Sequence, residues 1–345
     1  MDKFKYFAAY TVPLLGIYTF YSTGIYAYFG LLFLYFIVPL FEQLLPQNTY
    51  NFNKVEKEKA QETFIFDLTL YLIVPLYLFV IYTFLITISN PVISTSDLIA
   101  SMLMMGTILG VNGINVGHEL GHKTDQPFKM FLAHVMLTTS VQNHFVPYHN
   151  GAHHRDIGTP ADLTSAEEDD NFYFFAVRSQ IGGYFKTWKL EANKLKAKGK
   201  NTLWNPMILY TLLPLLLFVA IFILFGFKTM LIYFVTSIYG ISVLEAQNYF
   251  AHYGLRREIQ ENGIYEKVKP KHSWNSDHVI GRVLLFELTR HSDHHHMGAK
   301  PFQVLDSKQD SPLLPFGYPM MLMLSYFPFI FRPLMKKQLD LYRTA

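Results

Sequence analysis

Long apolar runs alternate with polar stretches along this chain. Six of these runs approach the roughly 20 residues that an α-helix needs to cross a lipid bilayer, and none of the six contains Lys or Arg. The pattern therefore predicts an all-α membrane protein, a single domain over 1–345, built on six transmembrane helices. The predicted spans are approximately 6–22, 25–45, 68–88, 98–117, 206–226 and 229–250.

Basic residues fall almost entirely on one side of these spans. The connection 89–97 contains no Lys or Arg, and the turn at 226–229 contains only Lys228. Because loops rich in Lys and Arg stay in the cytoplasm, we expect both termini and all large loops on that side of the cytoplasmic (inner) membrane. The segments that carry the histidines, 118–204 and 251–312, are then cytoplasmic.

The composition agrees with a membrane protein and limits its chemistry. The chain is 51% hydrophobic and 16% charged, whereas about 25% of residues are charged in an ordinary soluble domain. The first apolar run is followed directly by a second, which predicts a retained helix rather than a cleaved signal peptide. The chain has no cysteine, which excludes disulfides and a cysteine-ligated iron–sulfur or rubredoxin-type centre within it. Because the basic residues flank membrane helices, we do not expect nucleic-acid binding.

All fourteen histidines lie between positions 118 and 296, and nine of them form four tight groups. The spacings in HELGH and HSDHH place imidazoles on one side of a helix. In HNGAHH, an α-helix would place His149 and His153 on one face and His154 about 100° around it, so adjacent histidines could serve different ions. One ion seldom takes more than six ligands, so we expect two. The nine predicted ligands are His118, His122, His149, His153, His154, His252, His291, His294 and His295.

Other polar residues are assigned by their position relative to these ligands. We expect His134, His272, His278 and His296 not to bind metal, and His144 is a weak candidate. The helix positions of Asn115 and Asn248 place them on the same stripe as neighbouring ligands, and a carboxylate at membrane depth is costly unless it has a partner. The residues predicted to support the ligands are Asn115, Glu119, Glu245, Asn248 and Asp293.

The donor set favours oxygen chemistry over the alternatives. All-imidazole coordination suits zinc, copper, iron or nickel, and spacing alone does not separate iron from copper. HELGH also matches the HExxH motif of zinc proteases, with Glu119 as base, but a protease needs one further ligand rather than seven more histidines. A metal transporter would place its ligands in the middle of the spans. Two ions beside an apolar cavity fit O₂ activation on a hydrophobic substrate better. Iron suits this chemistry, and copper stays an alternative at this point.

Four motifs together resemble one known family. They are HELGHK (His118–Lys123), YHNGAHH (Tyr148–His154), NYFAHYG (Asn248–Gly254) and LTRHSDHH (Leu288–His295). In this order they resemble the integral-membrane alkane 1-monooxygenases of the membrane-bound di-iron desaturase/hydroxylase superfamily. The chain departs from the family pattern at Tyr148 and Ala251, where a glutamate is usual, and at Gly151 and Ala152, which are transposed.

The resemblance implies a specific reaction and specific partners. It implies two non-haem irons that use O₂ and two electrons to hydroxylate the terminal carbon of medium-chain n-alkanes, with no catalytic residues beyond the metal ligands. The electrons would come from a rubredoxin-type carrier with an NAD(P)H reductase. Related alternatives are a fatty-acyl desaturase or hydroxylase and a xylene-type alkylaromatic monooxygenase.

A hydrocarbon substrate needs an apolar path from the lipid to the metals. We expect the second and fourth spans to line this path, the second with aromatic and the fourth with small or flexible residues. The candidates are Phe33, Tyr35, Phe36, Met102, Met104, Met105, Gly106 and Gly110.

Overall fold

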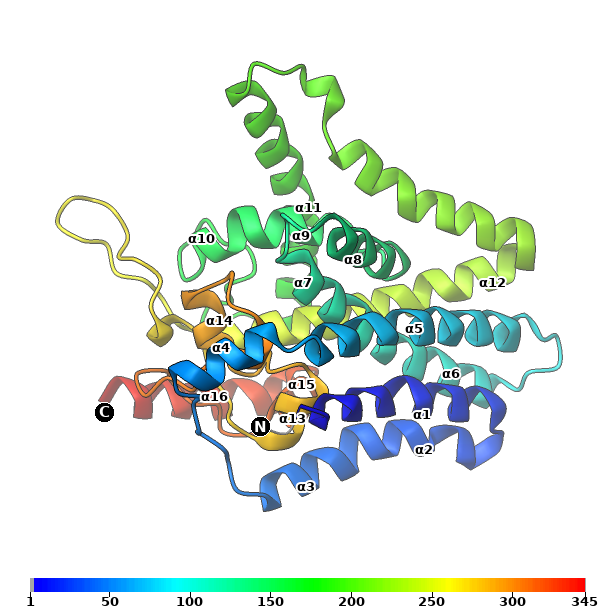
Figure 1. Cartoon of the computed structure of the whole chain (residues 1–345). Coiled ribbons are helices and arrows are strands. Elements are labelled where there is room, and N and C mark those ends of the chain that lie inside the picture. Colours follow the sequence, from blue (N-terminus) through cyan, green and yellow to red (C-terminus); the bar gives the residue numbers. More distant parts are fainter. Residues whose placement is uncertain (1–2, 345) are drawn as a thin grey trace.

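The computed structural model describes residues 3–344, and most of this range is helical. It contains no β-strand within that range, only isolated bridges between Ile259 and Tyr265 and between Asn275 and Leu313. The prediction of an all-α protein is therefore confirmed. Most of the long helices run side by side in one bundle, and the green helices of residues 172–226 extend away from it (Figure 1). Four further helices gather at one end of the bundle: α4 (Lys54–Glu62), α13 (Val279–Leu284), α14 (His291–His296) and α16 (Pro328–Thr344).

Within residues 3–344, four helical segments are long and apolar enough to cross a membrane. They are Gly24–Leu44, Ile65–Ser89, Thr95–Gly121 and Thr202–His252. The first three coincide with the second, third and fourth spans that the sequence predicts. The last contains α12 (Met207–His252), which covers both of the later predicted spans.

Helix α12 consists of two arms. The backbone at Gly226 has φ 84° and ψ 170°, which is not helical, and the chain reverses direction there (Figure 1). The predicted turn at 226–229 begins at this glycine. The first predicted span, 6–22, forms the 3₁₀-helix η1 (Lys5–Tyr10) and α1 (Thr11–Tyr21), a shorter segment than the other four. The number and direction of the membrane crossings stay predictions.

Polar residues mark where helices begin. Asn53 and Glu56 form a reciprocal capping box at the start of α4. Ser94 accepts a hydrogen bond from the Asp97 amide, 3.1 Å away, at the start of α6 (Thr95–Ile108). Asn171 caps α11 (Phe172–Ala197) in the same way. These side chains satisfy amides that have no partner within the first helical turn.

In the described part of the chain, three stretches within helices adopt π-helical geometry: η3 (Phe33–Ile37), η4 (Leu109–Ile114) and η5 (His149–His153). A π-helical turn holds one more residue than an α-helical turn, so it changes which side chains share a face. The short helices joined to them are α2 (Phe29–Leu32), α3 (Val38–Leu44), α7 (Asn115–Gly121), α9 (Phe145–Tyr148) and α10 (His154–Asp156). The other short elements are η2 (Gly24–Tyr28), η6 (Thr202–Trp204), η7 (Pro270–His272), η8 (Phe302–Val304) and α15 (Tyr318–Ser325).

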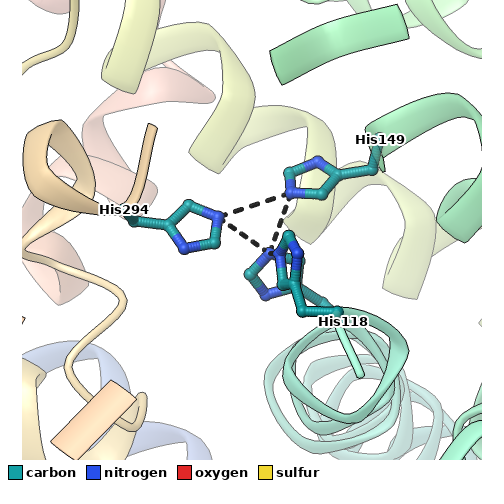
Figure 2. Close-up of side chains that lie close together, drawn as sticks. His118, His149 and His294 are labelled. Atoms are coloured by element: carbon teal, nitrogen blue, oxygen red, sulfur yellow. Dashed lines mark hydrogen bonds between the residues drawn. The ribbon is translucent and has the colours of Figure 1, made fainter. Parts of the chain in front are cut away.

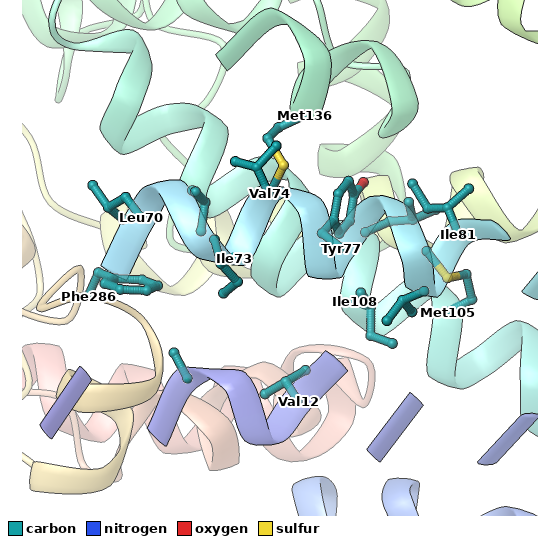
Figure 3. Packing of buried hydrophobic residues seen from close by; sticks show 14 of the residues in the cluster. Val12, Leu70, Ile73, Val74, Tyr77, Ile81, Met105, Ile108, Met136 and Phe286 are labelled. Carbon is teal, nitrogen blue, oxygen red and sulfur yellow. The ribbon is translucent and has the colours of Figure 1, made fainter. Parts of the chain in front are cut away.

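The main hydrophobic core surrounds α5 (Ile65–Ser89). Figure 3 shows Ile73 and Tyr77 of this helix packed between Val12 of α1, Ile108 of α6 and Met136 of α8 (Pro127–Thr139). All five side chains are buried. This core holds the helices that carry the first histidine motif in a fixed relation to the rest of the bundle.

A buried carboxylate anchors the segment that leads into α14. Oε1 of Glu287 accepts hydrogen bonds from Tyr6 (2.6 Å) and Lys5 (2.9 Å), and its Oε2 accepts one from Arg282 Nε (2.6 Å). Arg290 donates to the carbonyl of Leu305, 2.5 Å away. These bonds tie the N-terminal helix and the 282–290 segment together, directly before the histidines of α14.

Candidate metal centre

Four imidazoles from three separate parts of the chain converge on one point. Their Nε2 atoms lie 2.8 Å apart for His118 and His122, 2.9 Å for His118 and His149, and 3.1 Å for His118 and His294. Figure 2 shows the rings of His118, His149 and His294 directed at one another. Metal–imidazole bonds of about 2.0–2.1 Å place neighbouring ligand nitrogens roughly 3 Å apart, so this group could hold a metal ion.

A second group lies beside the first. His153, His252 and His295 are buried and place their ring nitrogens close enough together to hold another ion. His291 Nε2 lies 3.1 Å from His252 Nε2 and 3.0 Å from His295 Nε2. With His154, whose Nε2 lies 2.9 Å from His149 Nε2, the structure brings all nine predicted ligands together. Their role as ligands stays a prediction.

The second histidine motif does not follow the α-helical geometry expected from its spacing. Residues 149–153 form the π-helix η5, so His149 and His154 meet, whereas His153 joins the second group. The rings of His149 and His153 still lie side by side, with centroids 5.2 Å apart. The wider turn also brings position i+5 to position i, so the ring of His154 lies 4.4 Å from that of His149. Adjacent histidines still belong to different groups, as the sequence suggested.

Burial favours the neutral form, which metal binding requires, in several of these imidazoles. Burial, together with the neighbouring histidines, lowers the pKa of His149, His294 and His295 well below the usual value. At neutral pH the rings are therefore neutral and offer a lone pair. Nε2 of His153 has no hydrogen-bond partner within residues 3–344 and is free to bind an ion.

A residue that the motifs do not reveal supports His153. Oδ2 of Asp162 lies 2.9 Å from His153 Nδ1, and Asp162 also accepts hydrogen bonds from Thr164 (2.7 Å), Ser165 (2.6 Å) and Tyr148 (3.2 Å). Burial alone would raise the pKa of this carboxyl, but His153 and the hydroxyl donors outweigh burial and hold the pKa below its usual value. The carboxylate fixes the ring so that Nε2 points to the centre. No spacing rule links Asp162 to a histidine.

Two of the five polar residues predicted to support the ligands bond to backbone instead. Nδ2 of Asn115 donates to the carbonyl of Leu285, 3.0 Å away. Oε1 of Glu119 accepts from the amide of Phe302, 3.4 Å away. Both bonds join the stretch 115–119 of α7 to the segment 285–302, and a direct role of these two residues at the metals stays a prediction.

The other three also have partners outside the histidine groups. Glu245 accepts a hydrogen bond from Gln180, and Asp293 accepts one from Lys300, 2.5 Å away. Asn248 lines the apolar cavity described below. Within the described part of the chain, none of the side-chain hydrogen bonds made by these five residues ends on one of the nine histidines. Their support of the ligands therefore stays a prediction as well.

The remaining five histidines make separate contacts. The ring of His134 stacks on Tyr210 with centroids 5.1 Å apart, and His272 Nε2 lies 3.0 Å from a carboxylate oxygen of Glu266. The others are His144, His278 and His296, which contact Tyr184, Ser276 and the carbonyl of Val268. None of the five belongs to either group described above.

An apolar cavity reaches the histidines from within the bundle. Its wall includes His118, His149 and His291, and the rest of the wall comes mainly from η3, η4, α12, α13 and α15. Two of the three π-helical segments, η3 and η4, thus shape the cavity, and the third supplies His149. The hydroxyls of Tyr35 and Thr107, both on this wall, share a hydrogen bond of 2.8 Å. The arrangement can hold a hydrocarbon beside the metal centre.

Only part of the predicted substrate path lies on this wall. Tyr35 and Gly110 do line the cavity. Phe36 is 61% exposed on the outside of the bundle, and Gly106 packs against Tyr239. The other candidates, which pack elsewhere in the bundle, are Phe33, Met102, Met104 and Met105. The π-helical turns change the phase of both spans, so a regular helical period does not identify the inward face. The sequence reasoning missed the contributions of α13 and α15, for which it contains no periodic signal.

The departures from the family motifs are accommodated by packing. The hydroxyl of Tyr148 donates to Asp162, so a phenol contacts the carboxylate that orients His153. Ala251 is fully buried, and its carbonyl accepts the Trp274 amide at 2.9 Å. A Cβ at Gly151 would lie 2.8 Å from Cδ2 at the end of the Leu190 side chain.

Comparison with known proteins gives consistent likenesses. Residues 96–324 match the fatty acid desaturase family. Alkane 1-monooxygenase 1 of Alcanivorax borkumensis is 34% identical over 94% of this chain and 80% of its own length. An alkane 1-monooxygenase of Pseudomonas putida is 31% identical over 97% of this chain and 85% of its own length. The xylene/toluene monooxygenase hydroxylase component XylM of Pseudomonas putida is 27% identical over 91% and 83%.

These likenesses extend over nearly the whole chain, and they agree with an all-helical fold, apolar helices of membrane-spanning length and two histidine groups that could hold metal. The resemblance that the four motifs indicate is confirmed. The chain belongs to the alkane 1-monooxygenases, a family of oxidoreductases that carries the fatty acid desaturase domain.

Proposed function

We propose that this protein is a di-iron monooxygenase that hydroxylates the terminal carbon of medium-chain n-alkanes. The overall reaction is RH + O₂ + 2 e⁻ + 2 H⁺ → ROH + H₂O. The observation that carries the proposal is the meeting of nine imidazoles with an apolar cavity whose wall includes three of them. The names of the relatives, alkane 1-monooxygenases, supply the substrate class.

The histidines fit two iron ions. One ion would be held by His118, His122, His149 and His294, with His154 adjacent, and the other by His153, His252 and His295, with His291 adjacent. Neutral imidazoles suit iron, and a buried ring nitrogen without a protein partner, such as Nε2 of His153, is suited to bind a cation. When bound, the irons would supply O₂ activation with two electrons.

The remaining residues bind and orient the substrate. Each methylene transferred from water into the apolar cavity contributes about 0.8 kcal/mol, and the small number of polar groups on the wall leaves water little to bind. The side chains of Leu285, Leu288 and Val243 line the cavity with His291 and His118. A chain in this cavity presents its terminus to the histidines.

The electrons come from a separate carrier, which we propose to be rubredoxin-type and reduced by an NAD(P)H reductase. The chain has no cysteine to hold a redox centre of its own. The histidine centre comes nearest to the surface at His122 and His154, which are partly exposed, and Arg155 and Lys123 lie beside them. Such a surface suits a small acidic protein.

The protein lies in the cytoplasmic (inner) membrane with both termini and the metal centre on the cytoplasmic side. The distribution of Lys and Arg supports this orientation, since only Lys228 falls in a loop on the opposite side. The hydrocarbon then arrives from the lipid and the electrons from the cytoplasm.

Alkylaromatic oxidation is the second candidate, since XylM, a xylene/toluene monooxygenase component, is a relative over most of the chain. Acyl-chain desaturation or hydroxylation is a third possibility, which the family description suggests. A zinc protease fits poorly, because His118 and His122 converge with His149 and His294.

Metal and product analysis together test the proposal. Purified protein should contain close to two irons per chain, and with a rubredoxin and its reductase it should convert n-alkanes to 1-alcohols. Stoichiometric zinc without iron would contradict the oxygenase. In a panel of n-alkanes, alkylbenzenes and acyl lipids, benzyl alcohols or unsaturated acyl chains as the main product would move the assignment to the second or third candidate.

A further inference from the structure

Glu42 is a buried carboxyl that the metal centre does not use. It lies in α3, near the end of the second apolar segment, and is 0% exposed. Oε1 accepts a hydrogen bond from the amide of Gly281, 2.5 Å away, and Oε2 has no partner within residues 3–344. A carboxyl at this depth is costly, so its presence calls for a structural or functional reason.

Two glycines form the space that this carboxyl occupies. A Cβ at Gly281 would lie 2.8 Å from Oε1, and a Cβ at Gly317 would overlap Oε2 and Cδ. Neither glycine has a positive φ, so backbone conformation does not demand glycine at either position. Their lack of a side chain is explained by the room that Glu42 needs.

The three elements that meet at Glu42 are walls of the apolar cavity. Val38, one helical turn before Glu42, lines it from the second apolar segment. Leu284 lines it from α13, the helix that contains Gly281, and Pro319 from α15, which begins directly after Gly317. The carboxyl is therefore wedged where the walls join.

We propose that Glu42 is a positioning residue that sets the width of the substrate cavity by holding α3, α13 and α15 in register. This inference rests on the proposed function, because it concerns the hydrocarbon that the cavity admits. Removing the side chain leaves a void between the three helices. They can then move apart enough to admit a bulkier substrate. The specificity shifts from n-alkanes towards alkylbenzenes.

Substrate ratios test this role. In Glu42→Ala, the ratio of alkylbenzene to n-alkane turnover should rise about tenfold, the scale of one or two methylenes in a hydrophobic pocket, while the iron content stays unchanged. Glu42→Gln should keep the parental ratio, because its amide oxygen still accepts from Gly281 and fills the same space. Glu58→Ala, which removes an exposed carboxyl on α4, is the matched control. Equal ratios in Glu42→Ala and the parent, at full iron content, would overturn the proposal.

A second pair of variants tests the packing without turnover. Gly317→Ala should lower the thermal unfolding midpoint, because its Cβ overlaps the carboxyl, and Glu42→Ala/Gly317→Ala should recover much of the loss. Gly183→Ala, whose Cβ would meet Tyr148 at an ordinary 3.7 Å, is the control. If the double variant were no more stable than Gly317→Ala, the proposed packing of Glu42 against Gly317 would be refuted.

The two sets of measurements separate this inference from the proposed function. If the parent protein oxidises no hydrocarbon, the proposed function fails, and the unfolding midpoints still decide whether Glu42 and Gly317 are packed as described. If Glu42→Ala cannot be purified, Glu42→Asp, shorter by one methylene, should shift the substrate ratio in the same direction. An unchanged ratio in Glu42→Asp would then overturn the proposal.

Discussion

At the scale of single residues, the orientation of His153 depends on Asp162. The imidazole must present Nε2 to the centre, and a carboxylate at 2.9 Å from Nδ1 fixes both its rotation and its tautomer. Tyr148 contacts the same carboxylate. The position at which the chain departs from its family motif thus bears on the hydrogen bonding of a predicted ligand.

Replacing Asp162 by Asn should weaken metal binding without unfolding the protein. The neutral amide introduced by Asp162→Asn lacks the charge with which the carboxylate holds the His153 ring. Loss of such a partner of a metal ligand typically lowers metal affinity by about 10–100-fold. Iron per chain, measured after dialysis against graded chelator, should fall at lower chelator concentration than in the parent. Asp125→Asn, on an exposed loop, is the control. Identical chelator curves for Asp162→Asn and the parent would show that His153 does not need the carboxylate.

At the scale of elements, irregular helix geometry places the functional residues. In η5, the π-helical turn sends His149 and His153 to different groups. In η3 and η4 it turns Tyr35 and Gly110 towards the cavity. These elements are short, and their positions depend on the helices packed around them.

Glu287 joins elements that are distant in the sequence, and its charge should make stability depend on pH. Burial raises its pKa, but Arg282, Lys5 and Arg290 outweigh burial and lower the pKa to about 2. A carboxyl whose pKa is lowered in the folded state contributes stability above its usual pKa and loses that contribution as the pH falls towards about 2. The shift corresponds to about 3 kcal/mol.

The unfolding midpoint of Glu287→Gln, measured in detergent or nanodiscs between neutral pH and pH 2, checks this contribution. The variant should already be less stable than the parent at neutral pH, because Arg282 loses its buried partner. The difference should shrink below about pH 4.5, as the parent's carboxylate takes up its proton. Exposed Glu58→Gln should show no such difference. If the difference in unfolding midpoint between Glu287→Gln and the parent stayed constant with pH, the lowered pKa of Glu287 would be contradicted.

At the scale of the whole molecule, the fold gathers nine mutually close imidazoles. They come from segments that lie up to 177 positions apart, from His118 to His295. A neutral imidazole has only one N–H to donate, so without a cation these rings cannot satisfy one another. We therefore expect metal binding to stabilise the entire bundle.

Removing the metal should lower the unfolding temperature of the protein. An ion present at about 100 times its dissociation constant stabilises the folded state by roughly 2.7 kcal/mol, so two ions contribute about 5 kcal/mol. Differential scanning calorimetry of chelator-treated protein, before and after ferrous iron is restored, measures the effect. Equal midpoints with and without metal would mean that the histidine centre does not couple to the fold.

Much of this protein follows from sequence pattern alone. Apolar runs of spanning length require helices in a bilayer, because unpaired backbone groups are too costly there. Clusters of histidine at short spacing indicate metal, and four motifs in order indicate the family, which comparison confirms. These signals lie within short stretches of the chain, so they can be recognised without knowledge of the fold.

Other features were decided only by the tertiary structure. The pairing of His149 with His154, the support of His153 by Asp162 and the contribution of α13 and α15 to the cavity all join residues through packing. The π-helical turn that brings His149 to His154 has no periodic signal, and Glu42 meets Gly281 and Gly317 across more than 230 positions. The local pattern therefore indicated which residues are candidates for the metal centre, and contacts between distant segments decided which of these candidates lie together.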